Sequence, residues 1–222
     1  MTISDTVKEL FANYSTLSNL PTEYPYYDEL VRYTVGSIMS PSRSEKAVRF
    51  LYDLKPQHTA NYLVAALDKP NQEKIVIAVL QHYGPSDYTV IPLVATLRDN
   101  RKRGNINHIL LAYGPHDVVV RRLVGALQNP ELTEPAQYLL KEYGPTNTTC
   151  FYLTITLKNE SQVPTITEIL REYGPCKVNL RYIRHKLNSS SHYRPCQELL
   201  TFFEQKKQIH PRKKTAELSL SL

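Results

Sequence analysis

The tripeptide Tyr-Gly-Pro occurs four times in this chain, at Tyr83-Gly84-Pro85, Tyr113-Gly114-Pro115, Tyr143-Gly144-Pro145 and Tyr173-Gly174-Pro175. Each copy follows the previous one by 30 residues. A fixed period of this length is typical of proteins built from stacked structural repeats, in which each repeat packs only against its neighbours. The period therefore predicts the architecture of most of the chain.

An apolar stripe precedes each tripeptide, with the spacing of one face of an α-helix. Its columns read Val76, Ile106, Ala136 and Ile166, then Val79, Ile109, Leu139 and Ile169, then Leu80, Leu110, Leu140 and Leu170. Glycine provides the left-handed residue that ends many helices, and the proline after it cannot continue one. We expect a helix to end at each tyrosine, and the tyrosine to have a structural role at the edge of the core.

A second apolar stripe follows each proline and again has helical spacing. In the first copy it consists of Val90, Leu93 and Leu97, and equivalent apolar positions recur in the next three copies. Weaker copies at both ends of the chain bring the total to six helix pairs and a final unpaired helix. The predicted fold class is therefore all-α.

Short polar segments between the stripes are predicted to be loops between repeats. The clearest are Asp99-Asn100 and Asn129-Pro130. The cluster formed by Arg98, Arg101, Lys102 and Arg103 is expected to lie in such a loop, where solvent would surround its charges.

The repeat pattern runs almost from end to end, so we expect a single domain over residues 1–205 and a basic, disordered tail over residues 206–222. Residues 1–205 hold 22 Lys and Arg against 20 Asp and Glu, so most of the net charge of +6 belongs to the tail. No apolar run approaches the roughly 18–20 residues of a membrane span. The first residues lack the basic and apolar segments of a secretory signal, so we expect none, and an odd count of three cysteines argues against a disulfide framework. We therefore expect a cytoplasmic location.

A candidate binding surface lies beside the second stripe, on the helices that follow the turns. One column there reads Tyr62, Pro92, Arg122, Tyr152, Tyr182, and its neighbour reads Asn61, Ile91, Arg121, Phe151, Arg181. Aromatic and arginine side chains are enriched in interface hot spots. We predict that a partner binds Tyr62, Arg121, Arg122, Phe151, Tyr152, Arg181, Tyr182 and His185. The alternative is that the aromatic rings complete the core between repeats.

Common catalytic and metal-binding motifs do not occur in the sequence. It contains no CxxC, HExxH, GxSxG, Walker or GxGxxG pattern, and its seven histidines are scattered. We expect no catalytic residue, no metal site and no cofactor.

The run from Val79 to Asp99 resembles the short HEAT-like repeat of phycobilin lyase-type (PBS lyase) proteins, which reads roughly A-L-G, a turn, then V-P-x-L-x-x-A-L-x-D. The resemblance covers about residues 24–204, with the later copies keeping only the apolar frame. It implies a right-handed α-solenoid of about six HEAT-like helix pairs plus a capping helix. Members of this family include lyases that attach a bilin to an acidic phycobiliprotein.

Three functions are compatible with these observations. We expect a non-catalytic scaffold or adaptor that captures an acidic protein on the concave face formed by the helices after the turns. The first alternative, implied by the resemblance, is a bilin lyase-like chaperone or lyase subunit that acts on phycobiliproteins and is the one enzymatic possibility. The second alternative is nucleic-acid binding, in which the basic segments contact phosphates and the exposed aromatics stack on bases.

Overall fold

The computed structural model describes residues 3–13, 26–40, 42–188 and 193–209. Within these residues the chain forms thirteen α-helices, one short 3-10 helix and no strand, which confirms the all-α prediction and the expected number of helices. None of the described helices combines the length and the apolar character needed to cross a membrane.

The chain divides into two compact units, Met1–Gly144 and Pro145–Leu222. Unit 1 contains α1 (Ile3–Asn13), α2 (Tyr27–Ser37), α3 (Ser44–Asp53), α4 (Pro56–Ala65), α5 (Glu73–Tyr83), α6 (Asp87–Thr96), α7 (Asn100–Tyr113), α8 (Asp117–Ala126) and α9 (Pro130–Tyr143). Unit 2 contains α10 (Asn147–Thr156), the 3-10 helix (Glu160–Gln162), α11 (Val163–Tyr173), α12 (Lys177–Leu187) and α13 (Tyr193–Ile209). The expectation of a single domain over residues 1–205 stays a prediction. The first residues of the expected tail, 206–209, are helical and end α13, so that part of the prediction is wrong, and residues 210–222 lie outside the described residues.

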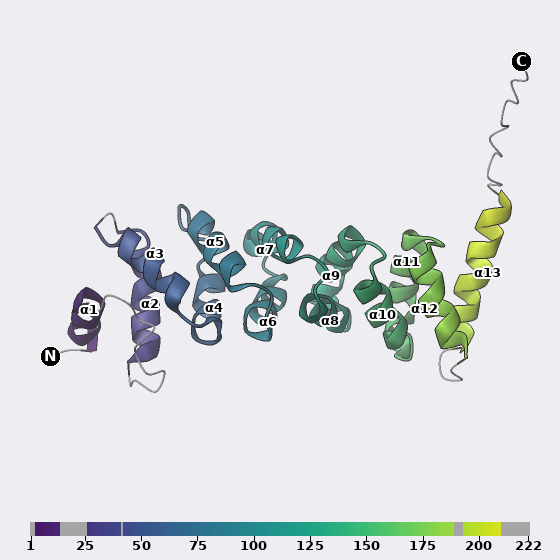
Figure 1. Ribbon diagram of the computed structural model, residues 1–222, viewed down its shortest axis with the longest axis horizontal. Helices are drawn as coiled ribbons and strands as arrows, with labels where there is room; N and C mark the ends of the chain where they lie inside the picture. Colours follow the sequence, from purple (N-terminus) through teal and green to yellow (C-terminus); the bar gives the residue numbers. More distant parts are fainter. Residues whose placement is uncertain (1–2, 14–25, 41, 189–192, 210–222) are drawn as a thin grey trace, which may run out of the picture. The chain divides into compact units, whose positions relative to one another are not determined.

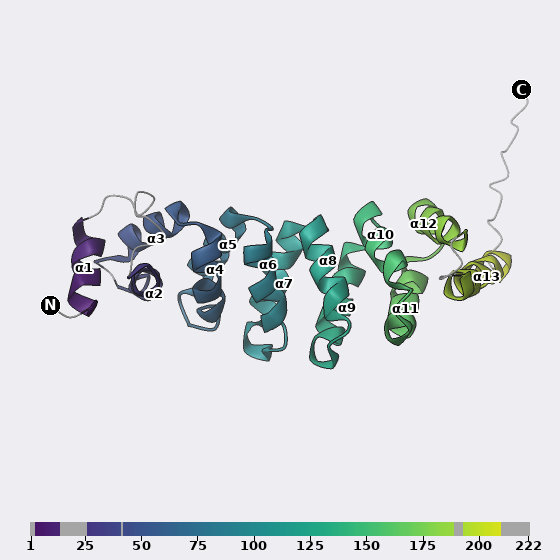
Figure 2. The same ribbon diagram turned by 90° about the horizontal axis from the view of Figure 1, so that it is seen from below.

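The helices of unit 1 pack in two rows. Helices α2, α4, α6 and α8 contact one another in sequence, and so do α3, α5, α7 and α9. Figure 1 shows the second row above the first, and Figure 2 shows the same helices from below. Between the rows, α2 packs on α3, α4 on α5, α6 on α7 and α8 on α9. Unit 2 repeats the scheme, because α10 contacts α12, α11 contacts α13, α10 contacts α11 and α12 contacts α13.

The pairs of helices that pack together are not the pairs joined by a Tyr-Gly-Pro turn. Within unit 1, α5 and α6 make few contacts with each other, and the same holds for α7 and α8. Each packed pair is instead joined by the polar segment between two sequence repeats. The structural repeat is therefore offset by one helix from the repeat that the tripeptide marks in the sequence.

The apolar columns form the core, as the sequence predicts. All twelve side chains of the three columns before the tyrosines have no exposed area: Val76, Val79, Leu80, Ile106, Ile109, Leu110, Ala136, Leu139, Leu140, Ile166, Ile169 and Leu170. Burial of such side chains is the main source of stability, at roughly 1.5–3 kcal/mol for each large one.

Helices α7 and α9 begin earlier than the sequence predicts, and the placement of Arg101, Lys102 and Arg103 in a loop is wrong. Asp99 accepts a hydrogen bond at 3.1 Å from the backbone N–H of Arg101, and Asn129 caps α9 in the same way. These side-chain caps satisfy N–H groups that have no partner inside the helix. Arg101, Lys102 and Arg103 therefore lie in the first turn of α7, where Arg103 Nε donates to the carbonyl of Leu97 at 3.0 Å, and only Arg98 stays in the turn before the helix.

Each Tyr-Gly-Pro glycine ends its helix with a positive φ, between 67° and 70°, and with a nearly extended ψ, a combination that only glycine adopts readily. The tyrosine before it reaches back to the preceding repeat. The hydroxyl of Tyr113 donates to the carbonyl of Leu80, and that of Tyr143 donates to the carbonyl of Leu110 at 2.6 Å. These carbonyls lie in the last turns of α5 and α7, where no N–H within the helix is left to pair with them. Tyr83, Tyr113 and Tyr143 thus each cap a helix of the repeat before their own.

The last repeat satisfies the same carbonyl by different means. Phe203 stands 30 residues after Tyr173 and has no hydroxyl. Asn179, which is fully buried, donates from Nδ2 to the carbonyls of Leu170 and Gly174, at 2.9 Å each. Its Oδ1 has no hydrogen-bond partner among the described residues. The amide of Asn179 therefore takes the place of the missing tyrosine hydroxyl.

Candidate partner-binding surface

The two predicted columns differ consistently in exposure. Every member of the column that contains Arg121, Phe151 and Arg181 is exposed, whereas every member of the column that contains Tyr62, Arg122, Tyr152 and Tyr182 is half-buried. The first column thus lies on the solvent-exposed face of the helices after the turns, and the second column lies at the edge of that face. The half-buried rings contribute both to packing and to the surface.

In unit 1, the two arginines of these columns share one acidic side chain of the neighbouring helix, Asp87. Arg122 on α8 places Nε 2.9 Å and Nη2 2.8 Å from Oδ1 of Asp87 on α6. Arg121 Nη2 lies 3.3 Å from both carboxylate oxygens. The hydrogen bonds from Arg122 are the main reason why the pKa of Asp87 is lowered from its usual value. These two predicted binding residues therefore already have a partner within the unit.

Tyr62 also lies in unit 1 and has a basic neighbour. The guanidinium carbon of Arg32 on α2 lies 5.3 Å from the centre of the Tyr62 ring on α4. A guanidinium over a ring face is a favourable cation–π arrangement, and it covers the ring that a partner would have to contact.

Unit 2 brings together the other five predicted residues on α10 and α12. Phe151, with 42% of its area exposed, lies edge-on to Tyr152 and Tyr182, with ring centres 5.2 Å and 6.0 Å apart. The guanidinium carbon of Arg181 lies 5.8 Å from the centre of the Tyr182 ring. His185 is exposed and follows Arg181 by one helical turn. We call this set, together with Ile155, Lys177 and Arg184, the α10–α12 surface.

The charge of this surface is uncompensated. Helix α12 carries Lys177, Arg181, Arg184 and Lys186 and contains no Asp or Glu. None of these four cations makes an ion pair with a described residue. Cations in the last turn favour the helix through its dipole, which accounts for part of the pattern. Lys177 and Arg181 stand before the last turn, where that explanation does not apply.

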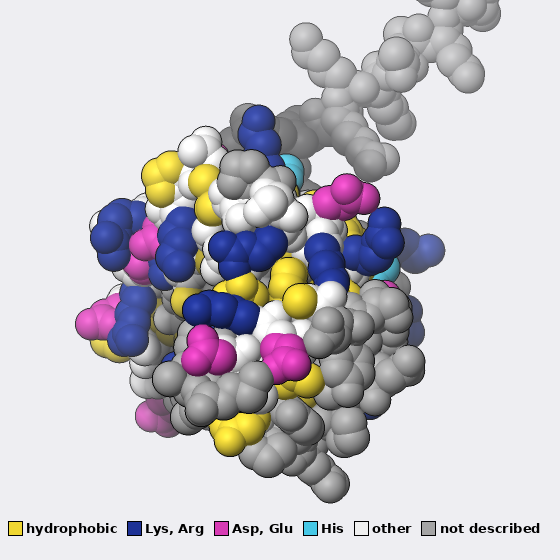
Figure 3. Space-filling view, turned by 90° about the vertical axis from the view of Figure 1, so that its left-hand side faces the viewer, with side chains coloured by type: hydrophobic (Ala, Val, Ile, Leu, Met, Phe, Trp, Pro, Cys, Tyr) yellow, Lys and Arg dark blue, Asp and Glu magenta, His cyan; other side chains and the backbone are white. Residues whose placement is uncertain are grey.

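The charge distribution differs on the side of the molecule shown in Figure 3. There, Lys and Arg side chains lie interspersed with Asp and Glu, and the described hydrophobic side chains between them form no broad patch.

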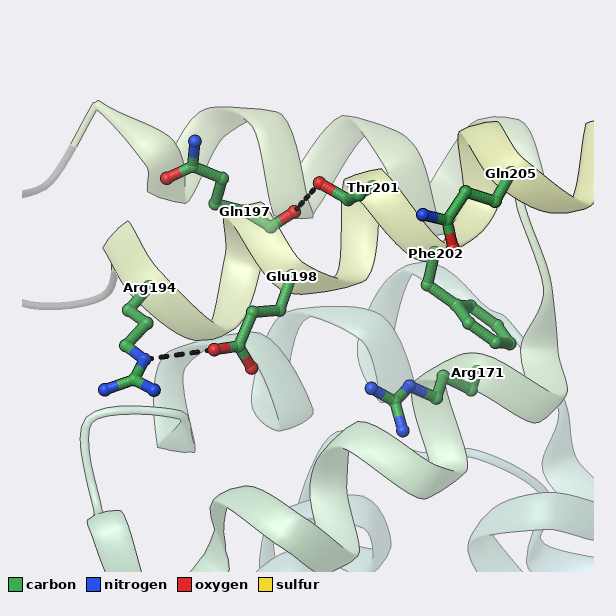
Figure 4. Close-up of a pocket in the computed structure, with 7 residues that line it drawn as sticks. All are labelled: Arg171, Arg194, Gln197, Glu198, Thr201, Phe202 and Gln205. Atoms are coloured by element: carbon green, nitrogen blue, oxygen red, sulfur yellow. Dashed lines mark hydrogen bonds and ion pairs between the residues drawn. The ribbon is translucent and has the colours of Figure 1, made fainter.

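An open groove between α11 and α13, of about 480 Å³, is a feature of unit 2 that the sequence did not indicate (Figure 4). The ring of Phe202 lies near two cations, with Arg171 Cζ at 5.0 Å and Lys206 Nζ at 5.1 Å from its centre. Arg194 and Glu198 form an ion pair at 3.0 Å along its rim. The adjacent Phe203 has the core spacing, and Phe202 follows from no periodic signal.

The thiols of Cys150 and Cys196 are protonated, and the described residues contain no cluster of metal ligands. Burial raises the pKa of Cys150 to about 12 and that of Cys196 to about 11, so both are protonated at neutral pH. All three cysteines are free. Among the described residues, no three His, Cys, Asp or Glu side chains are grouped so that they could hold a metal ion.

Comparison with known proteins gives no match of any kind. No family model matches the sequence, no curated protein is similar to it, and no solved structure matches its fold. The resemblance to lyase-type repeats therefore stays a prediction.

Proposed function

We propose that the protein is a non-catalytic scaffold that captures an acidic protein partner, and that the stacked helix pairs within each unit are HEAT-like turns of a right-handed α-solenoid. The observation that supports this proposal best is the α10–α12 surface, where an exposed Phe151 contacts two tyrosines beside cations that make no ion pair with a described residue. Interfaces of this composition bind proteins through aromatic anchors, and basic side chains steer an acidic partner into place. A rigid helical surface also loses little conformational entropy when it binds. The three free thiols fit the cytoplasmic location that we propose for this function.

The residues that carry the proposed function are not the full predicted set. Phe151, Tyr152, Arg181, Tyr182 and His185 are the binding residues in this proposal. Tyr62, Arg121 and Arg122 lie in unit 1 and have partners within it. We assign these three a mainly structural role, in which they hold adjacent helices of unit 1 together.

A comparative capture experiment tests the proposal. The wild-type chain and a Phe151→Ala, Arg181→Ala, Tyr182→Ala variant are used as baits in extract from the cells that express the protein, and the captured proteins are quantified by mass spectrometry. The expected result is an acidic protein that the wild type enriches at least ten-fold over the variant. Circular dichroism must show that the variant keeps its helical content, because a loss of helix would mean that these side chains belong to the core.

The same purified proteins separate the two alternative functions. A shift in the absorption of added bilin that the variant abolishes would favour a lyase-like role. Binding of a single-stranded oligonucleotide that persists near 200 mM salt, with a defined dependence on salt concentration, would favour nucleic-acid binding. Equal capture of every protein by wild type and variant would contradict the scaffold proposal.

A further inference from the structure

The α10–α12 surface consists of two adjacent rows with different chemistry. On α10, Phe151 and Ile155 are one helical turn apart and form an apolar row. On α12, Lys177, Arg181 and His185 are spaced by one turn and form a basic row. The 30-residue period places Phe151 level with Arg181 and Ile155 level with His185, and the two helices pack directly on each other. An apolar row and a basic row thus run side by side.

Because the row is basic, the surface of a partner that binds against it should be acidic. Helix α12 itself has no side chain that could neutralise the row, because it contains no Asp or Glu. Arg184 adds a further exposed cation one turn after Arg181. A partner that places carboxylates against this row gains charge-assisted contacts, and Arg is suited to bidentate pairing with carboxylate groups.

We infer that the α10–α12 surface binds an amphipathic α-helix of the partner, with an apolar stripe against Phe151 and Ile155 and a stripe of carboxylates against Lys177, Arg181 and Arg184. This inference rests on the proposed function and specifies the element that the partner presents. Residues three or four apart on a helix are about 5–6 Å apart, so stripes on the partner helix match the one-turn spacing of both rows.

The backbone chemistry of the surface favours a helix over an extended segment. Apart from the groups of the first and last turns, the N–H and C=O groups of α10 and α12 are paired inside each helix, so the surface offers no continuous row of backbone groups to which a strand could add. An extended segment would leave its own backbone groups to be satisfied by water or side chains alone. A helix satisfies its backbone internally and needs only side-chain complementarity.

The size of the surface sets the strength of binding that we expect. Helices α10 and α12 contain 10 and 11 residues, which at 1.5 Å per residue corresponds to about three helical turns of contact. A contact of this size is at the low end of specific interfaces, so we expect a dissociation constant of the order of micromolar. Because exposed cations contribute to it, the affinity should fall as salt is added.

The test uses a fluorescent synthetic peptide of about 18 residues, long enough to form a helix, with leucine at every third or fourth position and glutamate along the adjacent stripe. A second peptide has the same composition in an order that mixes leucine and glutamate around the helix. Binding to the full chain is measured by fluorescence anisotropy. We expect the ordered peptide to bind at least ten-fold more tightly than the mixed one.

Variants of the full chain locate the binding site. Phe151→Ala with Arg181→Ala should weaken binding of the ordered peptide at least ten-fold. Arg171→Ala with Phe202→Ala is the matched control, because it removes another arginine and phenylalanine in contact, in the groove between α11 and α13. This control should change the affinity less than two-fold.

Several outcomes would overturn the inference. They are equal binding of the two peptides, an equal loss in the control variant, absence of binding by either peptide, or displacement of the ordered peptide by an oligonucleotide of equal charge at equal concentration. If the capture experiment still yields an acidic protein that depends on Phe151 and Arg181, the scaffold proposal stands and only the helical form of the partner is rejected. If neither experiment detects binding, both proposals fall together.

Discussion

At the scale of single residues, the feature that joins repeats is the tyrosine hydroxyl. In unit 1, Tyr83, Tyr113 and Tyr143 each donate to a leucine carbonyl in the last turn of an earlier helix. The sequence predicted a structural role for the tyrosines from their place in the stripe. It did not predict the acceptor, because a contact over 32 or 33 positions depends on how neighbouring repeats are stacked. The sequence did contain one signal of this contact. In the last repeat, Phe203 stands at the tyrosine position and Asn179 stands at the position of Thr149, so both positions change together.

Substitutions at Asn179 and Phe203 should have coupled effects on the free energy of unfolding. Asn179→Ala leaves two carbonyls unpaired, so we expect it to lower the free energy of unfolding by about 2 kcal/mol. Asn179→Thr should also be destabilising, whereas adding Phe203→Tyr should restore much of the loss, since the new hydroxyl lies 33 positions after Leu170. Urea unfolding of Asn179→Thr, of Phe203→Tyr and of the double variant gives the coupling energy. Additive effects would refute this account.

Stability should fall at alkaline pH because of the same tyrosines. Burial raises the pKa of Tyr83 and of Tyr113 to about 12, against about 10 in the unfolded chain. The protonated form is therefore favoured by folding, and its contribution is complete below pH 10 and is lost as the pH rises toward 12. Urea unfolding followed at pH 9, 10 and 11 measures the decline. Buried cysteines act in the same direction, so the comparison that matters is with Tyr113→Phe, in which the decline should be smaller.

At the scale of elements, the helix ends are set by local chemistry that the sequence reveals only in part. The glycine stops were predictable, because glycine accepts the positive φ that ends each helix before proline. The early starts of α7 and α9 were missed, because Asp99 and Asn129 are common both in loops and as helix caps. The pairing of Asp87 with Arg121 and Arg122 was missed for a different reason. It joins two helices whose register is fixed only by packing.

Two glycines, Gly104 within α7 and Gly114 directly after it, provide a direct test of this local account. A Cβ atom at either Gly104 or Gly114 would meet no atom within 4 Å, so only backbone conformation distinguishes them. Gly114 has φ of 69°, and Gly114→Ala should lower the free energy of unfolding by about 1–2 kcal/mol. Gly104 lies within the helix, and Gly104→Ala should raise it by about 0.5–1 kcal/mol. Thermal unfolding followed by circular dichroism measures both, and a shift of the same sign in the two variants would contradict the explanation.

At the scale of the whole molecule, contacts are local in sequence. Each described helix packs against helices no more than three positions away along the chain. The repeat period made the helical composition and the core predictable from the sequence, since every repeat supplies the same columns. The pairing across the polar segments was not predictable, because the apolar stripes are equally consistent with either neighbour as the packing partner.

Local packing should give unit 1 a gradient of stability. Helix α6 packs against α4, α7, α8 and α9, whereas α1 packs mainly against α2. Elements with few neighbours open more often, so the backbone amides of α1 should exchange with solvent faster than those of α6. Hydrogen–deuterium exchange followed by mass spectrometry compares the two helices in one experiment. Equal protection of both would indicate that unit 1 opens only as a whole.

The tyrosine that caps a helix of the preceding repeat also bears on how such a chain can change in length. A duplicated or deleted block of 30 residues carries one tyrosine hydroxyl and one leucine carbonyl that needs a donor. The numbers of donors and acceptors in the chain therefore stay equal. Only the final block must close the series, as Asn179 and Phe203 do here. Gene duplication could therefore lengthen or shorten the protein in whole blocks while every cap remains intact.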